Sequence, residues 1–319
     1  IGVKATANGD NSKIVVNNSG DLYGGTKGLQ LWTDTSQQSY IDNSDIKVYN
    51  SGFMTATASD HLVIDAKGAS AEILNTGGML GRLDLTEQGD TFDNDGGDFE
   101  ARLTSDFRGG YDVFDNTNGG MVHTAEDPNA GEHVSFINLE RFNNLGGTIS
   151  LVDGGNNIDT FTLSGPTRYV GNNGGLAVDA YLASAPAGGK SDMLIINGTT
   201  EGNTDVSVNL TNPIGSSANT EGIPVVVVSG HGNTSEDDFN LRDGVINAGF
   251  LAWDMRLDTS GKDDVHELYT AGLGAGSYEF AAGITGMQDI WYQTAGTLLQ
   301  RQADLRPLIG TTQVQPVAD

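Results

Sequence analysis

The sequence predicts an all-β chain in which a right-handed parallel β-helix is capped by a more sandwich-like C-terminal β-module. Three observations lead to this fold class. The 319 residues include 45 glycines and only 7 prolines, a balance typical of short strands joined by many tight turns. An Asn-x-Gly motif recurs at irregular steps of roughly 20–30 residues, a period typical of solenoids. Short β-prone runs border most copies of the motif, with no helix signal between them.

Residues 1–165 are expected to form the coils of the β-helix. In the run Ile46–Tyr49, alternation places Ile46 and Val48 on one face of a strand and the other two residues on the opposite face. Such a coil cannot bury its apolar side alone, so it must stack on its neighbours. The motif, in a strict or a looser form, begins at Asn18, Asn50, Asn75, Asn94, Asn116 and Asn144.

Asparagine and glycine suit the corners of these coils, because both residue types tolerate left-handed backbone angles. A stacked asparagine can also form a hydrogen bond along the axis to the corner of the next coil. The alternative fold for this region is an ordinary antiparallel sandwich with Asn-Gly hairpins.

Residues 166–296 are expected to form the C-terminal β-module. The texture of the sequence changes near Leu151, and a turn rich in Gly and Asn at 171–175 leads into denser and more apolar strands. Residues 297–319 are expected to be a short helical linker and a loose tail. The helix is predicted at Thr297–Arg306, because these residues are good helix formers and Pro307 halts them.

The composition excludes several classes of function. A net charge of −26 is incompatible with binding to phosphate backbones, which requires Lys and Arg, so no nucleic-acid partner is expected. The plain interpretation of this charge is solubility and self-repulsion, and the sharper one is a set of carboxylates for Ca²⁺ outside the cell. The chain has no cysteine, which removes thiol nucleophiles and thiolate zinc sites.

A series of short phrases follows in a fixed order through the second half of the chain. They are Asp159–Gly165, Leu176–Asp179, Ser191–Gly198, Thr204–Asn209, Glu221–Val226, the pair Phe239 and Leu241, and the closing Asp289–Tyr292. In this order the phrases resemble the autochaperone-bearing end of classical (type Va) autotransporter passengers. One departure is Asp258–Gly283, which looks like an extra hairpin or loop before the closing phrase.

The resemblance implies a precursor that threads this passenger through its own C-terminal translocator barrel. The C-terminal coils would fold first, at the surface of a Gram-negative bacterium, and would template the coils behind them. Large aromatic residues suit such a folding nucleus or cap, since they bury the most apolar area, and plain core packing is their alternative role. The candidates are Phe239, Trp253, Trp291 and Tyr292. The helix at Thr297–Arg306 resembles the linker that plugs the barrel, or is a frayed surface helix. The opening at Ile1, without an initiator Met or an apolar leader, is expected of a fragment of a longer precursor.

Two constellations invite a chemical interpretation. Asp93, Asp95 and Asp98 are the candidates for a structural Ca²⁺ site, although their spacing fails the calcium-loop pattern. The fragments Asn203–Asp205, Gly230–Gly232 and Asp237-Asp238 match short signatures of the β-helical polygalacturonases, whose paired carboxylates act as acid and base. Here the acidic pair follows the Gly-His-Gly fragment instead of preceding it, and the basic tripeptide of those enzymes is missing.

We therefore predict no catalytic residue and no cofactor beyond structural Ca²⁺. The expected function is that of a surface-displayed or secreted passenger fragment acting as an adhesin. Its partners would be host or bacterial cell-surface molecules, and weak self-association would serve the same role. A β-helical polysaccharide-active enzyme and a purely structural stalk are the alternatives.

Overall fold

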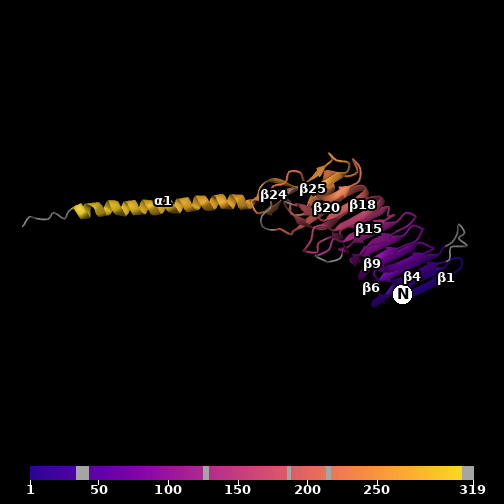
Figure 1. Ribbon diagram of the computed structural model, residues 1–319. Coiled ribbons are helices and arrows are strands. Elements are labelled where there is room, and N and C mark those ends of the chain that lie inside the picture. The colour runs from indigo at the N-terminus through magenta and orange to yellow at the C-terminus, as the bar shows by residue number, and fades with distance from the viewer. Residues whose placement is uncertain (34–42, 125–128, 185–187, 213–216, 311–319) are drawn as a thin grey trace, which may run out of the picture.

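A computed structural model describes residues 1–33, 43–124, 129–184, 188–212 and 217–310 of the chain. Short strands stack into coils along one axis, and a long helix leaves the far end of the stack (Figure 1). The predicted parallel β-helix is thereby confirmed. Each strand pairs in parallel with the strand one coil away, so the coils have three sheet faces, which we call faces A, B and C.

Each face is built from one strand of every coil. Face A contains β2 (Lys13–Asn18), β5 (Asp45–Asn50), β8 (Ala71–Asn75), β10 (Thr91–Asp95), β13 (Val113–Thr117) and β16 (Arg141–Leu145). Face B contains β3 (Asp21–Gly24), β6 (Phe53–Ala56), β9 (Gly78–Asp84), β11 (Asp98–Ala101), β14 (Met121–His123) and β17 (Thr148–Ser150). Face C contains β1 (Val3–Ala7), β4 (Lys27–Thr33), β7 (Leu62–Lys67), the end of β9, β12 (Thr104–Asp106) and β15 (His133–Ile137).

The two longest strands each run through all three faces. The strand β18 (Thr160–Tyr181) and the strand β20 (Met193–Leu210) pair in parallel over most of their length and form the last two complete coils. The strands β21 (Ile223–Val228) and β22 (Phe239–Leu241) then add one strand each to faces C and B. In the described residues, the named strands of successive coils before this point pair in parallel, and one isolated antiparallel bridge joins Thr117 to Gly146.

An antiparallel cap closes the C-terminal end of the stack. It consists of β23 (Ile246–Ala248), β24 (Leu251–Asp258) and β25 (Asp264–Leu273), and β25 also pairs antiparallel with β21. The short β19 (Lys190–Ser191) pairs antiparallel with the end of β18. The extra hairpin that the sequence predicts within Asp258–Gly283 corresponds in part to the turn between β24 and β25.

The Asn-x-Gly motifs form a ladder of buried amides at the corner between faces A and B. Each side-chain Nδ2 donates to the Oδ1 of the asparagine one coil further toward the C-terminus, over distances of 2.7–3.1 Å. The members are Asn18, Asn50, Asn75, Asn94, Asn116 and Asn144. The ladder ends on Tyr169, whose hydroxyl lies 3.3 Å from Nδ2 of Asn144. The bond along the axis that the sequence predicts is therefore present at every copy.

Glycine residues follow the ladder asparagines in the sequence because the asparagine amides leave no room for a side chain at those positions. A Cβ at Gly147 would lie 2.3 Å from Nδ2 of Asn116, and one at Gly120 would lie 2.6 Å from Oδ1 of the same residue. The requirement here is close approach, and a left-handed backbone is needed only at some neighbouring positions, such as Gly146 with its φ of 73°.

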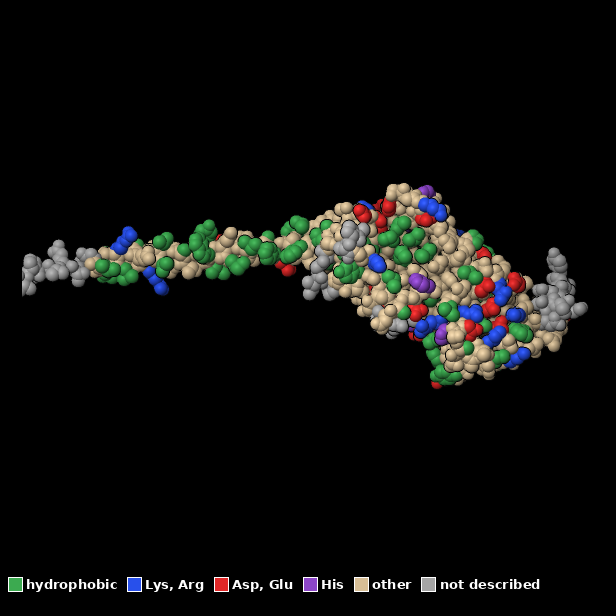
Figure 2. All heavy atoms as spheres, in the orientation of Figure 1, with side chains coloured by type: hydrophobic (Ala, Val, Ile, Leu, Met, Phe, Trp, Pro, Cys, Tyr) green, Lys and Arg blue, Asp and Glu red, His purple; other side chains and the backbone are tan. Residues whose placement is uncertain are grey.

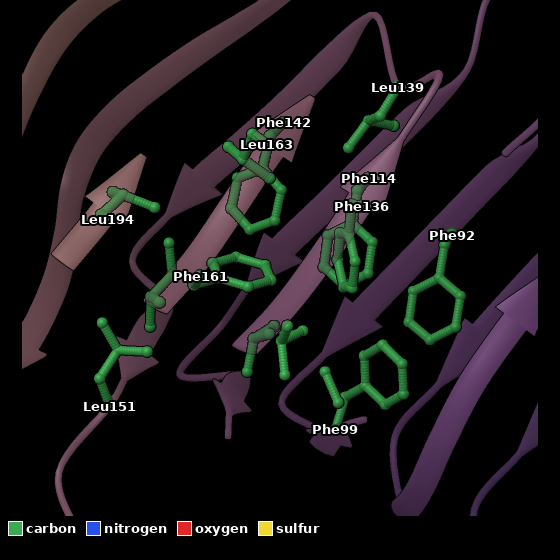
Figure 3. Close-up of a cluster of buried hydrophobic side chains, with 14 of the residues drawn as sticks. Phe92, Phe99, Phe114, Phe136, Leu139, Phe142, Leu151, Phe161, Leu163 and Leu194 are labelled. Carbon is green, nitrogen blue, oxygen red and sulfur yellow. The ribbon is translucent and has the colours of Figure 1, made fainter. Parts of the chain in front are cut away.

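Aromatic side chains fill the interior of the middle coils (Figure 3). The rings of Phe92 and Phe114 stack with centroids 4.8 Å apart, and those of Phe114 and Phe142 stack 5.0 Å apart. The column continues through Tyr169 to Phe239 in the last coil. Because parallel strands in register place identical positions above one another, a one-coil repeat of aromatics produces a continuous stack.

The C-terminal helix α1 (Ala275–Gly310) differs from the prediction. The sequence predicts a closing strand at Asp289–Tyr292 and a helix that begins at Thr297 and stops before Pro307, whereas α1 covers all these residues. The predicted strand is wrong; the predicted helix is present at Thr297–Arg306, but its bounds are wrong because α1 begins earlier and continues past Pro307. The segment is rich in Ala, Leu and Gln, and a helix satisfies its backbone hydrogen bonds locally without a free strand edge. The predicted tail at 311–319 lies outside the described residues. Among the residues that the structure describes, no helix is long and apolar enough to cross a membrane.

We expect the replacement Asn94→Ala to destabilise the coils strongly. Nδ2 of Asn94 donates to Asn116 and to the carbonyl of Met121, and its Oδ1 accepts from Asn75. Loss of this amide leaves buried partners unpaired, so the free energy of unfolding should fall by about 2–4 kcal/mol, measured by urea unfolding followed by circular dichroism. The control Asn17→Ala removes an exposed amide on face A and should cost under about 0.5 kcal/mol. Equal losses in the two variants would contradict the role of the ladder.

Candidate functional site

Two of the four predicted cap residues lie in or against the antiparallel cap: Trp253 belongs to it, and Phe239 lies on β22 of the last coil and contacts it. Trp253 on β24 is fully buried and pairs with Ile246 on one side and Thr270 on the other. Phe239 is 1% exposed, stacks on Tyr169 with centroids 5.6 Å apart, and meets the ring of His266 edge-on at 5.0 Å. These two side chains thus join the cap to the aromatic column. The burial of Phe239 and Trp253 agrees with the expectation from the sequence, while their role in nucleating folding stays a prediction.

The other two predicted cap residues are not in the cap. Trp291 and Tyr292 lie on α1, are each 65% exposed, and contact one another with ring centroids 5.2 Å apart. Helix α1 approaches the cap only near its start, where Phe280 lies 5.8 Å from Phe250. Figure 2 shows hydrophobic side chains along the whole helix, away from the body. In this structure Trp291 and Tyr292 therefore lie outside the cap.

A buried polar cluster holds the loop between β21 and β22 against the cap. His266 is 1% exposed, and its Nε2 lies 2.9 Å from Oγ1 of Thr234. Burial lowers the pKa of His266 to about 4, so the ring is neutral at pH 7. The carboxylate of Asp238 accepts hydrogen bonds from the hydroxyls of Thr200 and Thr234 and from the backbone N–H of Ser235. Asp238 is thus occupied with fastening this loop.

The fragments that resemble polygalacturonase signatures lie near one another, but the hydrogen bonds around them hold the backbone of this loop. Thr204, within Asn203–Asp205, pairs with Phe239 in register, next to Asp238. In the Gly230–Gly232 fragment, the N–H of Gly232 donates to Asp264, and Nδ1 of His231 lies 3.1 Å from the same carboxylate. Of the acidic pair Asp237-Asp238, Asp237 is exposed, whereas Asp238 is buried and its carboxylate is occupied by hydrogen bonds, so Asp238 is not an open carboxylate beside a bound sugar.

The structure separates the three candidate Ca²⁺ ligands. Asp93 and Asp95 project from face A on β10, where they accept hydrogen bonds from Thr117 and Asn118. Asp98 starts β11 on face B, and its carboxylate lies 3.0 Å from Nε2 of His123. In the part of the chain that the structure describes, no three His, Asp or Glu side chains lie close enough to hold a metal ion. The three aspartates therefore do not form one site.

Acidic residues line the other two corners of the coils; Glu140 is half-buried and the others are buried. At the corner before face A, each carboxylate accepts a backbone N–H from the preceding coil. These bonds are Ala71 to Asp90 at 2.6 Å, Asp90 to Asp112 at 2.6 Å, and Asp112 to Glu140 at 2.8 Å. At the corner before face C, the same bond joins Glu132 to Asp159 at 2.7 Å and Asp159 to Asp192 at 3.0 Å. Among the described residues, none of these carboxylates forms an ion pair with Lys, Arg or His.

Burial without a cation raises the pKa of four of these carboxyl groups. Burial is the main cause in each case, and neighbouring carboxylates add to it for three of the four. The values are about 6 for Asp90, about 7 for Asp112, about 6 for Asp159 and about 8 for Asp192. The backbone N–H bonds oppose the shift, since they favour the ionised form.

The sequence analysis misses these corner carboxylates as a group, although a signal is present. An acidic residue stands four positions before the ladder asparagine in three successive coils, as Asp90 before Asn94, Asp112 before Asn116, and Glu140 before Asn144. An acid at a fixed offset from a repeated corner residue indicates a second column at the preceding corner. Asp159 and Asp192 fall within the quoted phrases but carry no assigned role there.

Comparison with known families gives one match to this region. Residues 137–255 match the family model for autochaperone domain type 1. The match covers the coils from β16 to β22, the strand β23 and β24 as far as Met255, including Phe239 and Trp253; β25 lies beyond it. Comparison with curated proteins finds no significant match.

We expect the chain to become less stable as the pH rises from 6.5 to 8.5. Asp112 and Asp192 have folded-state pKa values of about 7 and about 8, above those of an unfolded chain, so their contribution is complete at low pH and is lost as they ionise. The free energy of unfolding should fall by about 2 kcal/mol over this range. Below pH 6.5 the buried His266 acts in the opposite direction, because the unfolded chain binds its proton first.

Urea unfolding at the two pH values measures this loss. The control is the double variant Asp112→Asn/Asp192→Asn, which keeps an acceptor oxygen at both corners and should show a flatter pH dependence. An unfolding midpoint that rises between pH 6.5 and 8.5 would rule out the raised pKa values.

Proposed function

We propose that this chain folds from its autochaperone domain during export and displays the preceding coils for attachment to cell surfaces. The chain has the parallel β-helix and the autochaperone domain of a C-terminal autotransporter passenger region. Autotransporter passengers are exported to the surface of a Gram-negative bacterium or secreted from it. The observation that carries the proposal is the position of the matched residues 137–255, at the closed end of the stack.

The cap supports nucleation by the C-terminal end. Its hairpin β24–β25 is a local pairing that needs no other coil, because the two strands are adjacent in sequence. Trp253 and Leu268 are both fully buried in it, and Phe239 joins it to the last coils. A coil near the N-terminus, in contrast, gains its partners only from coils on either side.

The exposed apolar surface of helix α1 favours a binding partner on the C-terminal side of the stack. Its 36 residues span about 54 Å and carry exposed large apolar side chains over the whole length. These are Tyr278, Phe280, Ile284, Met287, Ile290, Trp291, Tyr292, Leu298, Leu299, Leu305, Leu308 and Ile309. A helix with apolar residues on all sides is stable in water only when something surrounds it. The partner that we propose is the translocator barrel of the same precursor, with α1 as the linker inside it.

Face B supports attachment to cell-surface molecules. Tyr23 is 61% exposed, and its ring lies 5.8 Å from that of Phe53, which packs closely over Gly78. The pair Asp98 and His123 lies further along the same face. Exposed aromatic rings beside hydrogen-bonding side chains suit the mixed apolar and polar surfaces of cell-surface glycans and proteins.

The proposal predicts that cap and coil residues act differently on the folding rate. We expect Trp253→Phe to slow refolding of the chain, because the cap is formed in the transition state, while Phe92→Leu mainly speeds unfolding. Each variant removes buried apolar volume and should cost about 1–3 kcal/mol of stability. Stopped-flow folding and unfolding in urea measures both rates. Unchanged refolding of Trp253→Phe, or equal slowing by both variants, would rule out nucleation by the cap.

The attachment function predicts a loss of cell binding when the aromatic pair is removed. Beads coated with the chain should bind bacterial or epithelial cells, and the variant Tyr23→Ser/Phe53→Ser should bind at least about tenfold fewer cells, since aromatic residues dominate contact energies. The control Tyr111→Ser removes an exposed aromatic residue from another corner and should bind normally. If neither the original chain nor the control binds any cell type, the stalk alternative is favoured.

A further inference from the structure

The first coil of the matched domain presents one side-chain acceptor at each of its three corners. We call this coil, residues 140–164, the edge coil, because the match begins at residue 137. Its three acceptors are Glu140, Asn144 and Asp159. They accept from Asp112 N at 2.8 Å, from Asn116 Nδ2 at 3.1 Å, and from Glu132 N at 2.7 Å, respectively. All three donors belong to the coil on the N-terminal side.

The direction of the amide bond at Asn144 is determined by backbone groups. Nδ2 of Asn116 also donates to the carbonyl of Thr148, and Nδ2 of Asn144 donates to the carbonyl of Gly175. A flipped amide would place oxygen against oxygen at both positions. Each ladder amide therefore directs its nitrogen toward the C-terminal neighbour and its oxygen toward the N-terminal neighbour.

The same polarity holds for the corner bonds from residue 71 onward. Backbone N–H groups donate to a side chain of the next coil toward the C-terminus at Ala71, Leu83, Asp90, Asp112, Glu132 and Asp159. Among the described residues of the coils, two such backbone N–H bonds run the other way, from Asn43 to Asn11 and from Ala69 to Thr33, and both lie before this region. Beyond the coils, the N–H of Ala275 at the start of α1 also donates backward, to Oδ1 of Asn247.

This polarity gives a bare edge coil a defined binding capacity. With residues 1–134 not yet folded, the oxygens of Glu140, Asn144 and Asp159 remain in water, where they are hydrated at little cost. An arriving segment brings backbone N–H groups, which must find an acceptor once they are buried. Bonds from N–H to a carboxylate are among the stronger ones. Three fixed acceptors at three corners also select one register, because a slip of one residue would reverse every side chain.

We propose that Glu140, Asn144 and Asp159 form a docking edge that takes residues 112–124 and 129–134 of the same chain as the next coil and thereby sets the register of the coils N-terminal to it. The inference rests on the proposed folding from the C-terminal domain and names the groups through which that domain would act. The three are positioning residues that perform no chemistry: Glu140 and Asp159 bind backbone N–H groups of the incoming coil, and Asn144 binds the side-chain amide of Asn116.

An earlier coil provides a matched control. Its residues Asp90, Asn94 and Ser105 accept from Ala71 N at 2.6 Å, from Asn75 Nδ2 at 2.8 Å and from Leu83 N at 3.0 Å. This set has the same three-corner geometry but lies outside the matched domain, two coils before the edge coil. Only the coils before residue 90 depend on it for docking.

The test is refolding of the full 319-residue chain from urea, followed by pulsed hydrogen exchange with peptide-resolved mass spectrometry. In Glu140→Ala/Asn144→Ala/Asp159→Ala, we expect residues 160–273 to gain protection at the original rate. Residues 3–124 and 129–134 should gain it at least about tenfold more slowly. In Asp90→Ala/Asn94→Ala/Ser105→Ala, only the coils before residue 85 should be delayed.

A conservative variant separates docking from general damage. Glu140→Gln/Asp159→Asn keeps an acceptor oxygen at both corners and should refold within about threefold of the original rate. The docking edge is overturned if the alanine variant leaves residues 3–134 at the original rate, or if it delays residues 160–273 equally. Failure of the underlying function looks different: the unmodified chain would then protect its N-terminal coils first or all coils together.

Discussion

The stacking of the coils depends on hydrogen bonds at the corners, where the chain turns from one face to the next. Along the faces, parallel strands satisfy one another's backbone groups, but at a corner the ladder is interrupted and a buried N–H or carbonyl needs another partner. Asparagine amides fill this need between faces A and B, and carboxylates fill it at the other two corners. The aromatic column then packs inside a frame whose register these bonds hold.

This solution places negative charge where it is costly. Carboxyl groups such as Asp112 and Asp192 are fully buried, and in the described structure neither has a cationic partner. Their raised pKa values measure that cost. If folding proceeds from the C-terminal domain as proposed, the arrangement has a use, since a carboxylate at an open edge is hydrated and ready to accept an N–H before the next coil covers it. The cost of burying these carboxyl groups would then accompany a defined order and register of coil assembly.

The two ends of the molecule differ in whether they bury their apolar side chains without a partner. The strands of the antiparallel cap pair with one another locally in sequence and join the stack through β21 and β25, and Trp253 is buried among them within the matched domain. Beyond it, α1 satisfies its backbone by itself but leaves apolar side chains exposed along its length. One element is thus complete without a partner, and the other is not. This contrast agrees with a passenger region whose folded body lies outside the membrane while its end leads toward a translocator.

The sequence by itself determined the parallel β-helix, the position of every ladder asparagine, and the burial of Phe239 and Trp253. These features depend on local pattern and on a repeat that stacks like residues at one-coil spacing. The tertiary structure alone decided the surroundings of Trp291 and Tyr292, because an apolar run of this length fits a strand only if a free edge is available, and β24 and β25 already occupy that place. It also decided that Asp93 and Asp98 lie on different faces, while Asp90, Asp112 and Glu140 form a column. Whether carboxylates meet depends on which corner each coil assigns to them, and this is set by coil lengths that vary along the chain.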